Sequence, residues 1–233
     1  MVILSRTFTP PPTGIQADTL DIEQEVLINE NGTPVNYIVV HQGKPSSRYD
    51  ASCDGTWLLR KGIASYRKWD SGNSNVLESS DIHSYLNNTW INRYDTRIRN
   101  AIKQVKIPYR QNGGLGGTDR SGSNGLSCKI FPLSGKEVGW DSSDNRNFPN
   151  DGAKLAYFLD GTGSSANSKR VAKLNGSATR WWLRSPCTND TAGVWGVSSG
   201  GDYGDWRTGL SYGVRPAFIL PSTFVFLESE VVQ

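Results

Sequence analysis

Residues 180–220 constrain the fold more than any other part of the sequence, because two regular apolar segments enclose an irregular one. The first segment is RWWLRSP at 180–186, and the second is GVRPAFIL at 213–220. Both have the aromatic and branched composition of buried strands. Of the 26 residues at 187–212, 20 are Gly, Ser, Thr, Asn, Asp, Tyr or Trp. This mixture is typical of recognition loops, because Gly and Asn permit unusual backbone angles while Tyr and Trp offer large contact areas.

The composition argues against several classes of protein. With 233 residues the chain can bury a substantial core, and eight Trp, nine Tyr and seven Phe supplement a hydrophobic content of 36%. The net charge of +3 is too small to indicate nucleic acid or an anionic membrane as a partner. Three scattered cysteines predict neither a disulfide framework nor a zinc site. The apolar start at 1–4 is too short for a signal peptide, so we expect cytoplasmic synthesis and no membrane insertion.

The apolar patterns predict a mixed α+β fold. A β-hairpin is expected at 26–40, with its turn at Asn31-Gly32. Residues 80–91 carry apolar side chains at helical spacing, and a second short helix begins near Asp95. Further strands are expected at 56–61, 127–133, 181–184, 194–197 and 214–220. Five tryptophans beside these elements are expected in the core, namely Trp57, Trp90, Trp140, Trp181 and Trp182.

The same patterns predict a single main domain. We find no internal repeat and no clear linker between residues 21 and 225, so this range is taken as the domain. Residues 1–20 contain a run of three prolines and predict an extended arm that docks the domain or mediates oligomerisation. Residues 226–233 are expected to be a short tail.

Motifs for catalysis are weak. His41 and His83 lie in no metal-binding spacing and beside no nucleophile. The Gly-rich segment 112–119 lacks the Lys-Ser/Thr pair of a phosphate-binding loop and is interpreted as a flexible surface loop. We therefore expect no catalytic residue, no metal and no cofactor. One enzymatic alternative stays open, in which Asp202 or Asp205 shares a cleft with a second carboxylate and acts on carbohydrate or peptide.

The polar and aromatic side chains of 187–212 are the candidate ligand-binding residues, because they lie among glycines where exposure is expected. They are Asn189, Asp190, Trp195, Asp202, Tyr203, Asp205, Trp206, Arg207 and Tyr212. Arg184 and Arg215 lie inside the flanking strands, and we expect them to brace the site through ion pairs.

Six phrases together resemble one known family. They are YIVVHQG (37–43), CDGTWLLRK (53–61), SDIHSYLN (80–87), IKQVKIPY (102–109), WWLRSP (181–186) and GVRPA (213–217). Over residues 21 to about 222 the chain resembles an uncharacterised domain family, widespread in gut bacteria and their phages, that ends in a WWLRSP…GVRPAF signature. That signature is similar to C-type-lectin-like domains of the formylglycine-generating-enzyme type. The resemblance implies an α+β fold with a small twisted, mainly antiparallel sheet, two helices and long structured loops.

Such domains include phage receptor-binding proteins diversified by retroelements. The catalytic cysteine pair of the oxygen-dependent enzyme and the calcium-binding tripeptides of lectins are not recognisable here. The resemblance therefore implies a non-enzymatic virion protein, such as a tail, fibre or capsid-decoration component, that recognises a host-surface protein or glycan. It would contact other virion proteins through its arm, and it could form a homo-oligomer. In the alternative, a structural virion component, the loops of 187–212 contact a neighbouring subunit. Adenine-directed mutagenesis of Asn codons cannot yield Lys, Gln, Glu, Met or Trp. This segment has none of the first four, and Trp195 and Trp206 would have to be fixed positions.

Overall fold

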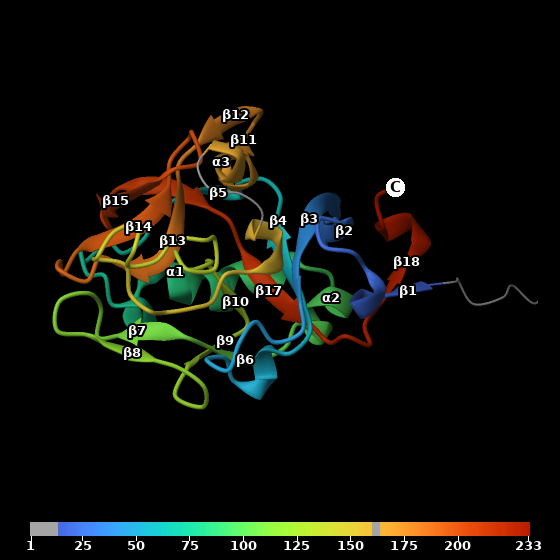
Figure 1. Cartoon of the computed structure of the whole chain (residues 1–233). Helices are drawn as coiled ribbons and strands as arrows, with labels where there is room; N and C mark the ends of the chain where they lie inside the picture. Colours follow the sequence, from blue (N-terminus) through green and yellow to red (C-terminus); the bar gives the residue numbers. More distant parts are fainter. Residues whose placement is uncertain (1–13, 160–163) are drawn as a thin grey trace, which may run out of the picture.

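The computed structural model describes residues 14–159 and 164–233, which fold as a mixed α+β protein with mostly antiparallel sheets (Figure 1). The first five-stranded sheet has the order β10 (Ile130–Phe131), β17 (Ala217–Leu220), β4 (Thr56–Arg60), β3 (Thr33–Gln42) and β2 (Glu25–Glu30). The second has the order β15 (Tyr203–Arg207), β14 (Gly193–Val197), β13 (Trp181–Pro186), β16 (Ser211–Val214) and β5 (Ser65–Lys68). Within the two sheets, only β13 and β16 pair in parallel.

Four two-stranded ladders and several short helices complete the described part of the chain. The ladders are β1 (Gly14–Gln16) with β18 (Val225–Leu227), β6 (Val105–Ile107) with β9 (Leu126–Cys128), β7 (Tyr109–Gln111) with β8 (Thr118–Arg120), and β11 (Ala172–Leu174) with β12 (Ser177–Thr179). The α-helices are α1 (Asp81–Ser84), α2 (Thr96–Ala101) and α3 (Ser164–Arg170). Short 3₁₀ turns lie at Ala17–Thr19, Ala51–Cys53, Leu77–Ser79, Ala156–Phe158 and Glu228–Glu230.

The predicted hairpin is confirmed as β2 and β3. Its turn residues Asn31 and Gly32 have φ angles of 52° and 84°. Two consecutive positive φ angles produce the tight turn whose twist suits an antiparallel pair, and Asn-Gly is the dipeptide that adopts them most readily. The turn therefore fixes the register in which Val26 faces Tyr37 and Ile28 faces Val35.

The predicted helix at 80–91 is also present, but its hydrogen bonding changes along its length. After α1 the chain continues through a π-helical turn at Tyr85–Thr89 and a 3₁₀ turn at Trp90–Arg93. The hydroxyl of Ser80 caps the start by accepting a hydrogen bond from the His83 amide at 3.2 Å. The carboxylate of Asp95 likewise caps α2. Both caps satisfy amides that a helix leaves without a partner.

The core consists of two clusters of buried side chains on opposite faces of the strands. Successive residues of a strand point to opposite faces, so Trp181 enters one cluster and Trp182 the other. Trp57 and Leu58 divide in the same way on β4. We call the cluster that contains Trp57 and Trp181 the first core, and the cluster that contains Trp182 the second core. The five tryptophans expected in the core are all buried.

Packed residues extend beyond the predicted domain limits of 21 and 225. Strand β1 pairs with β18, and Ala17 and Phe226 are fully buried in the second core. Thus residues 14–20 of the predicted arm and residues 226–231 of the predicted tail pack onto the same body, at the end of the molecule opposite β15 (Figure 1). Residues 1–13, which carry the proline run, lie outside the described residues.

Among the described residues, no helix combines the length and hydrophobicity that crossing a membrane would require.

Candidate recognition surface

The predicted recognition loops are built on a regular β-hairpin of β14 and β15. Ser198 donates its amide to the Asp202 carbonyl at 2.7 Å, and Thr208 donates its amide to the Ala192 carbonyl at 3.0 Å. These two bonds lie at the two ends of the β14–β15 ladder and set its hydrogen-bonding pattern. In that pattern the backbone N–H and C=O groups of Tyr203, Asp205 and Arg207 point away from β14. Because β15 is the last strand of its sheet, it presents this edge outward.

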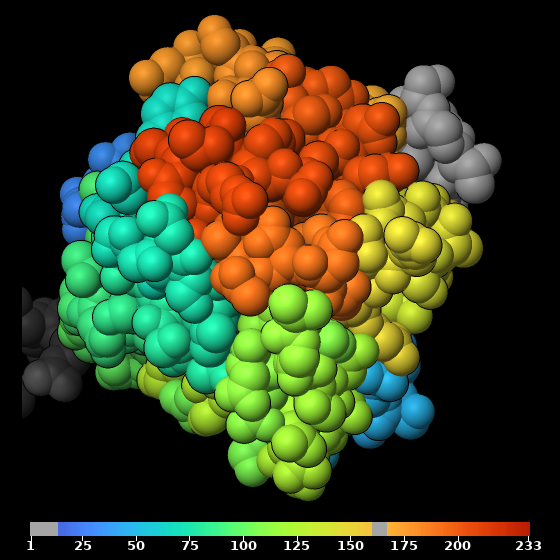
Figure 2. All heavy atoms as spheres, turned by 90° about the vertical axis from the view of Figure 1, so that its left-hand side faces the viewer, coloured from blue at the N-terminus to red at the C-terminus, as the bar shows by residue number. Residues whose placement is uncertain are grey.

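We call the surface formed by residues 187–192, strand β15 and the turn 208–210 the recognition face. In Figure 2 these orange-to-red segments occupy the middle of one side of the molecule. Segments near residues 65–80 (teal), 112–120 (green) and 140–150 (yellow) surround them. Residues that are distant in sequence therefore border a single continuous surface.

One predicted contact residue is misplaced, because Trp195 is buried with only 2% of its surface exposed. Its position on β14 directs the indole into the first core, where it stacks on Phe148 at a centroid distance of 4.1 Å. The indole N–H donates to the Asn147 carbonyl at 3.1 Å. Tyr203, on the same face of the hairpin, is half-buried against both rings. Trp195 thus supports the hairpin from beneath and does not contact solvent.

Trp206 lies on the other face of the hairpin, flat over two glycines. A Cβ atom at Gly196 or at Gly204 would approach the indole to 2.6 Å. The half-buried indole also meets Tyr212 edge-on at a centroid distance of 5.2 Å. The guanidinium of Arg180 lies 5.3 Å from the Trp206 ring centroid and 5.6 Å from that of Tyr212. Two aromatic rings in edge-on contact and one cation therefore pack together at this side of the sheet.

The turn that precedes β14 is organised by Asp190. Its carboxylate accepts hydrogen bonds from the Ala192 amide at 2.9 Å and from the Arg207 guanidinium at 3.1 Å. The bond from Ala192, with a smaller contribution from Arg207, lowers the pKa of Asp190. Neighbouring Asn189 is exposed and accepts a hydrogen bond from the Cys187 thiol. Burial raises the pKa of Cys187 to about 11, which keeps this sulfur a neutral thiol rather than a nucleophile.

The Gly-rich loop at 112–117 is docked against this turn through its buried residues Gly113 and Gly114, so the prediction of a flexible surface loop is wrong for these two residues. The buried amide side chain of Asn75 donates to the carbonyls of Asp190 and Gly193 and accepts from the Gly114 amide, all at 2.9–3.0 Å. A Cβ atom at Gly114 would lie 1.9 Å from the Cys187 carbonyl oxygen. Glycine is therefore required for the close approach of the two loops.

Arg184 braces the site from below, as predicted. Its guanidinium forms a two-pronged ion pair with Glu137, both contacts at 2.6 Å, and both side chains are fully buried. It also donates to the carbonyls of Pro108, Pro132 and Asp151. This set satisfies the guanidinium without solvent, as a buried charge requires.

Arg215 does not form the predicted ion pair with any carboxylate of the described residues. It is buried, donates Nε to the Arg60 carbonyl at 2.7 Å, and lies 5.0 Å from the Trp181 ring centroid. Its Nη1 has no hydrogen-bond partner in the described structure. Burial consequently lowers the pKa of Arg215 to about 10. Arg215 was expected inside a strand but lies in the two-residue connection between β16 and β17, where stacking on the Trp181 indole replaces the expected salt bridge.

The nine predicted contact residues thus separate by exposure. Exposed on the surface are Asn189, Asp202, Asp205 and Arg207; half-buried are Asp190, Tyr203, Trp206 and Tyr212; buried is Trp195. Asp202 and Asp205 line none of the described cavities. In the described residues, no group of three or more His, Cys, Asp or Glu side chains is placed to hold a metal ion.

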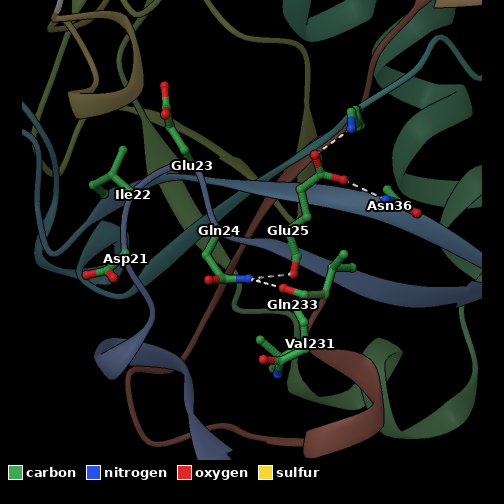
Figure 3. A pocket seen from close by; sticks show the side chains of 10 residues that line it. Asp21, Ile22, Glu23, Gln24, Glu25, Asn36, Val231 and Gln233 are labelled. Carbon is green, nitrogen blue, oxygen red and sulfur yellow. Dashed lines mark hydrogen bonds and ion pairs between the residues drawn. The ribbon is translucent and has the colours of Figure 1, made fainter.

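None of the four described cavities was predicted from the sequence; one lies far from the recognition face and one borders it. The larger, of about 700 Å³, lies at the opposite end of the molecule, where Gln24 bonds to the Val232 carbonyl and Glu25 bonds to Asn36 and Lys61 (Figure 3). The smaller, of about 350 Å³, borders β16 and the recognition face; we call it the β16 cavity. Its polar walls include Tyr66, Thr179, Arg180, Ser199, Ser211 and Tyr212. Tyr212 is the one predicted contact residue among them, whereas Arg180, directly before the Trp-Trp pair, was not predicted as a contact residue.

Comparison with known proteins gives a family but no characterised relative. A family model described as "Domain of unknown function (DUF6273)" matches residues 54–222, which is more than half of the chain. Neither the curated proteins nor the solved structures contain a match to this chain.

Proposed function

The chain belongs to the DUF6273 family of domains of unknown function, and from this premise we propose that it is a non-enzymatic recognition module. Its recognition face would bind a protein or a glycan on a host surface. The observation that carries the proposal is the combination of exposed polar side chains with a backbone that is fixed from behind. Asp205 and Arg207 are exposed, whereas Trp195 and Trp206 of the same hairpin pack on opposite core clusters.

Preorganisation is what makes this arrangement suited to binding. A loop that is already ordered loses little conformational entropy when it meets a partner. Here Asn75 ties the turn at 187–193 to the Gly-rich loop, and Asp190 holds its own turn through the Ala192 amide. The exposed side chains therefore stand at defined positions before any ligand arrives.

The positions of the carboxylates favour binding over catalysis. The enzymatic alternative needs Asp202 or Asp205 to face a second carboxylate in a cleft. Both side chains are exposed at the edge strand and its preceding turn, and Asp190 already accepts from Arg207. The conformation supports contact with a broad surface rather than enclosure of a substrate.

We also propose the finer identity that the signature motifs imply. The scaffold would be C-type-lectin-like and the protein a phage virion component, in a tail, a fibre or a capsid decoration, made in the bacterial cytoplasm. The pairing of Trp181 in β13 with Gly213 in β16 joins the first signature segment to the start of the second, which then continues into β17 of the other sheet, and this supports a shared scaffold. The N-terminal arm predicted at residues 1–20, of which 14–20 pack onto the body, would mediate contacts to other virion proteins or between copies of the chain.

A cell-binding assay tests the recognition role. Labelled protein is incubated with intact cells of a panel of gut bacterial strains, and bound fluorescence is measured by flow cytometry. We expect saturable binding to some strains and an affinity lower by about tenfold or more for the double variant D205A/R207A. The matched control is D18A/R99A, which also removes one charge of each sign but lies in the turn Ala17–Thr19 and in α2, outside the recognition face. Absence of binding to every strain, or equal losses in both variants, would contradict the proposal.

The virion location has its own test. Mass spectrometry of purified phage particles should detect the protein, and neighbouring genes should encode tail or capsid proteins. A reverse transcriptase gene with a template repeat of codons 187–212 would add diversification to the proposal. The outward backbone edge of β15 favours one second candidate, a structural virion component, because such an edge can pair with another chain. Burial of Tyr203 and Trp206 between subunits in an assembled particle would favour that candidate over receptor binding.

A further inference from the structure

The β16 cavity has walls from four separate parts of the chain. Tyr66 comes from β5, Thr179 and Arg180 from the end of the β11–β12 hairpin, Ser199 from the turn between β14 and β15, and Tyr212 from β16. Figure 2 shows these teal, orange and red segments meeting above the middle of the recognition face. The Tyr66 and Thr179 hydroxyls form a 2.8 Å hydrogen bond that joins two walls. The cavity is therefore a constructed part of the fold and not a gap beside one loop.

Arg180 is the only charged residue that lines the cavity. Among the described residues, no carboxylate oxygen lies within 4.0 Å of its guanidinium nitrogens. The guanidinium is held in place by the Trp206 and Tyr212 rings, and Nη1 donates to the Tyr212 hydroxyl at 3.3 Å. An oriented guanidinium with donors to spare is suited to a carboxylate, which it can bind with two parallel hydrogen bonds.

The remaining walls of the cavity supply hydroxyl groups and one exposed aromatic ring. Ser199 and Ser211 offer hydroxyls that both donate and accept hydrogen bonds, whereas the Thr179 hydroxyl already shares a bond with Tyr66. Tyr66 is 50% exposed, so its ring face is open to contact. A sugar ring presents hydroxyls at its rim and C–H groups on its faces, and these match the hydroxyls and the tyrosine ring. The volume of about 350 Å³ lies at the small end of ligand pockets and suits one residue of a glycan rather than a folded partner.

We propose that the β16 cavity binds an acidic sugar residue, a uronic acid or a sialic acid, with its carboxylate on Arg180 and its ring against Tyr66. This inference rests on the proposed recognition function and names its ligand class. The cavity adjoins the recognition face, so a terminal acidic sugar held here would leave the rest of a glycan to cross β15. A neutral saccharide would leave Arg180 without a carboxylate to bind, and a peptide would find no apolar floor.

The test is an NMR titration of the labelled full chain with four ligands. Two are acidic sugars with a free carboxylate, the methyl glycosides of glucuronic acid and of N-acetylneuraminic acid; the others are methyl glucoside and inorganic phosphate. Saturable shifts of the Trp206 and Trp182 indole signals are expected with at least one acidic sugar, with about tenfold weaker binding of the neutral glucoside. The variant R180Q should lower the affinity for the acidic sugar about tenfold or more. The control R120Q, which replaces an exposed arginine on β8, should leave this affinity unchanged. Equal binding of glucoside, equal binding of phosphate, or no shift with either acidic sugar would overturn the proposal.

The cell-binding assay separates this inference from the proposed function. One outcome is that cells bind the protein, that D205A/R207A weakens this binding and that R180Q does not. In that case the recognition function stands and the acidic-sugar site is refuted. If R180Q and removal of acidic sugars from the cells by glycosidase weaken binding alike, both proposals are supported. If no cells bind but an acidic sugar titrates the cavity, the site stands and host recognition fails.

Discussion

At the scale of single residues, the buried side chains beneath β13 differ in how their charge is accommodated. Arg184 and Glu137 neutralise each other in a fully buried pair. Asp151 is also fully buried, but only one of its oxygens is bonded, to the Ser185 hydroxyl at 2.7 Å, while Oδ1 has no partner. Burial raises the pKa of Asp151 to about 7, although the charge of Arg184 opposes the shift. The carboxyl group is therefore neutral in the folded protein below neutral pH.

This raised pKa predicts a specific dependence of stability on pH. Between about pH 4, where Asp151 ionises in the unfolded chain, and about pH 7, the folded chain keeps a proton that the unfolded chain has lost. The contribution of Asp151 to the free energy of unfolding thus falls as pH rises through this window, by roughly 2 kcal/mol between pH 5 and 7, and is constant above it. Urea unfolding at pH 5, 6, 7 and 8 should show this decline in the wild type and a smaller one in D151N. The exposed control D205N should follow the wild type; parallel curves for wild type and D151N would contradict the assignment.

At the scale of elements, strands with a local pattern of apolar residues were predicted from the sequence. Strands that depend on contacts with distant residues were not. Val194–Val197 was expected and is part of β14, but YGDWR at 203–207 resembles a loop because Gly and Asp are depleted in strands. Gly204 is present because the Trp206 ring lies on it, a contact that no local pattern reveals. Without β15 the alternation of side chains could not be assigned, so Trp195 and Trp206 were expected to be equally exposed. The strand expected at 127–133 is likewise divided into β9 and β10, because Asn87 accepts hydrogen bonds from the amides of Lys129 and Ile130.

The contact between Gly204 and Trp206 can be tested by adding one methyl group. In G204A the Cβ would lie 2.6 Å from the indole, so the ring must move, and we expect a loss of about 1–2 kcal/mol in the free energy of unfolding with a change in tryptophan fluorescence. The control G200A meets its nearest atom only at 3.9 Å and should cost little. In a W206A background the G204A substitution should lose most of its cost, as a double-mutant cycle by urea unfolding would show. A cost that is unchanged in that background would place the strain in the backbone instead.

At the scale of the whole molecule, long-range contacts decide how segments without regular structure are held. Residues 132–155 contain no helix or strand, yet most of their apolar side chains are buried. They pack around Arg184, whose partners include Pro132, Glu137 and Asp151. The sequence predicted that Arg184 would form an ion pair, but not with which residue, because its partners lie at least 33 positions away. The packing of β1 on β18 escaped prediction for the same reason: each strand is three residues long and has little signal of its own.

If Arg184 organises this irregular segment, removing its guanidinium should loosen the segment before the rest of the chain. In R184M the Glu137 carboxylate stays buried without its cation and three carbonyls lose a donor, so we expect a loss of about 3–5 kcal/mol in the free energy of unfolding. Trypsin under native conditions should then cleave first after Lys136, Arg146 or Lys154, which mass spectrometry identifies from the fragments. The control R99M removes a partly exposed arginine on α2 and should alter neither quantity by much.

Because β13 leads from Arg184 directly into the turn at 187–192, R184M should also weaken binding at the recognition face. A variant that loses stability but is cleaved at scattered sites would show that Arg184 supports the core in general and not this segment.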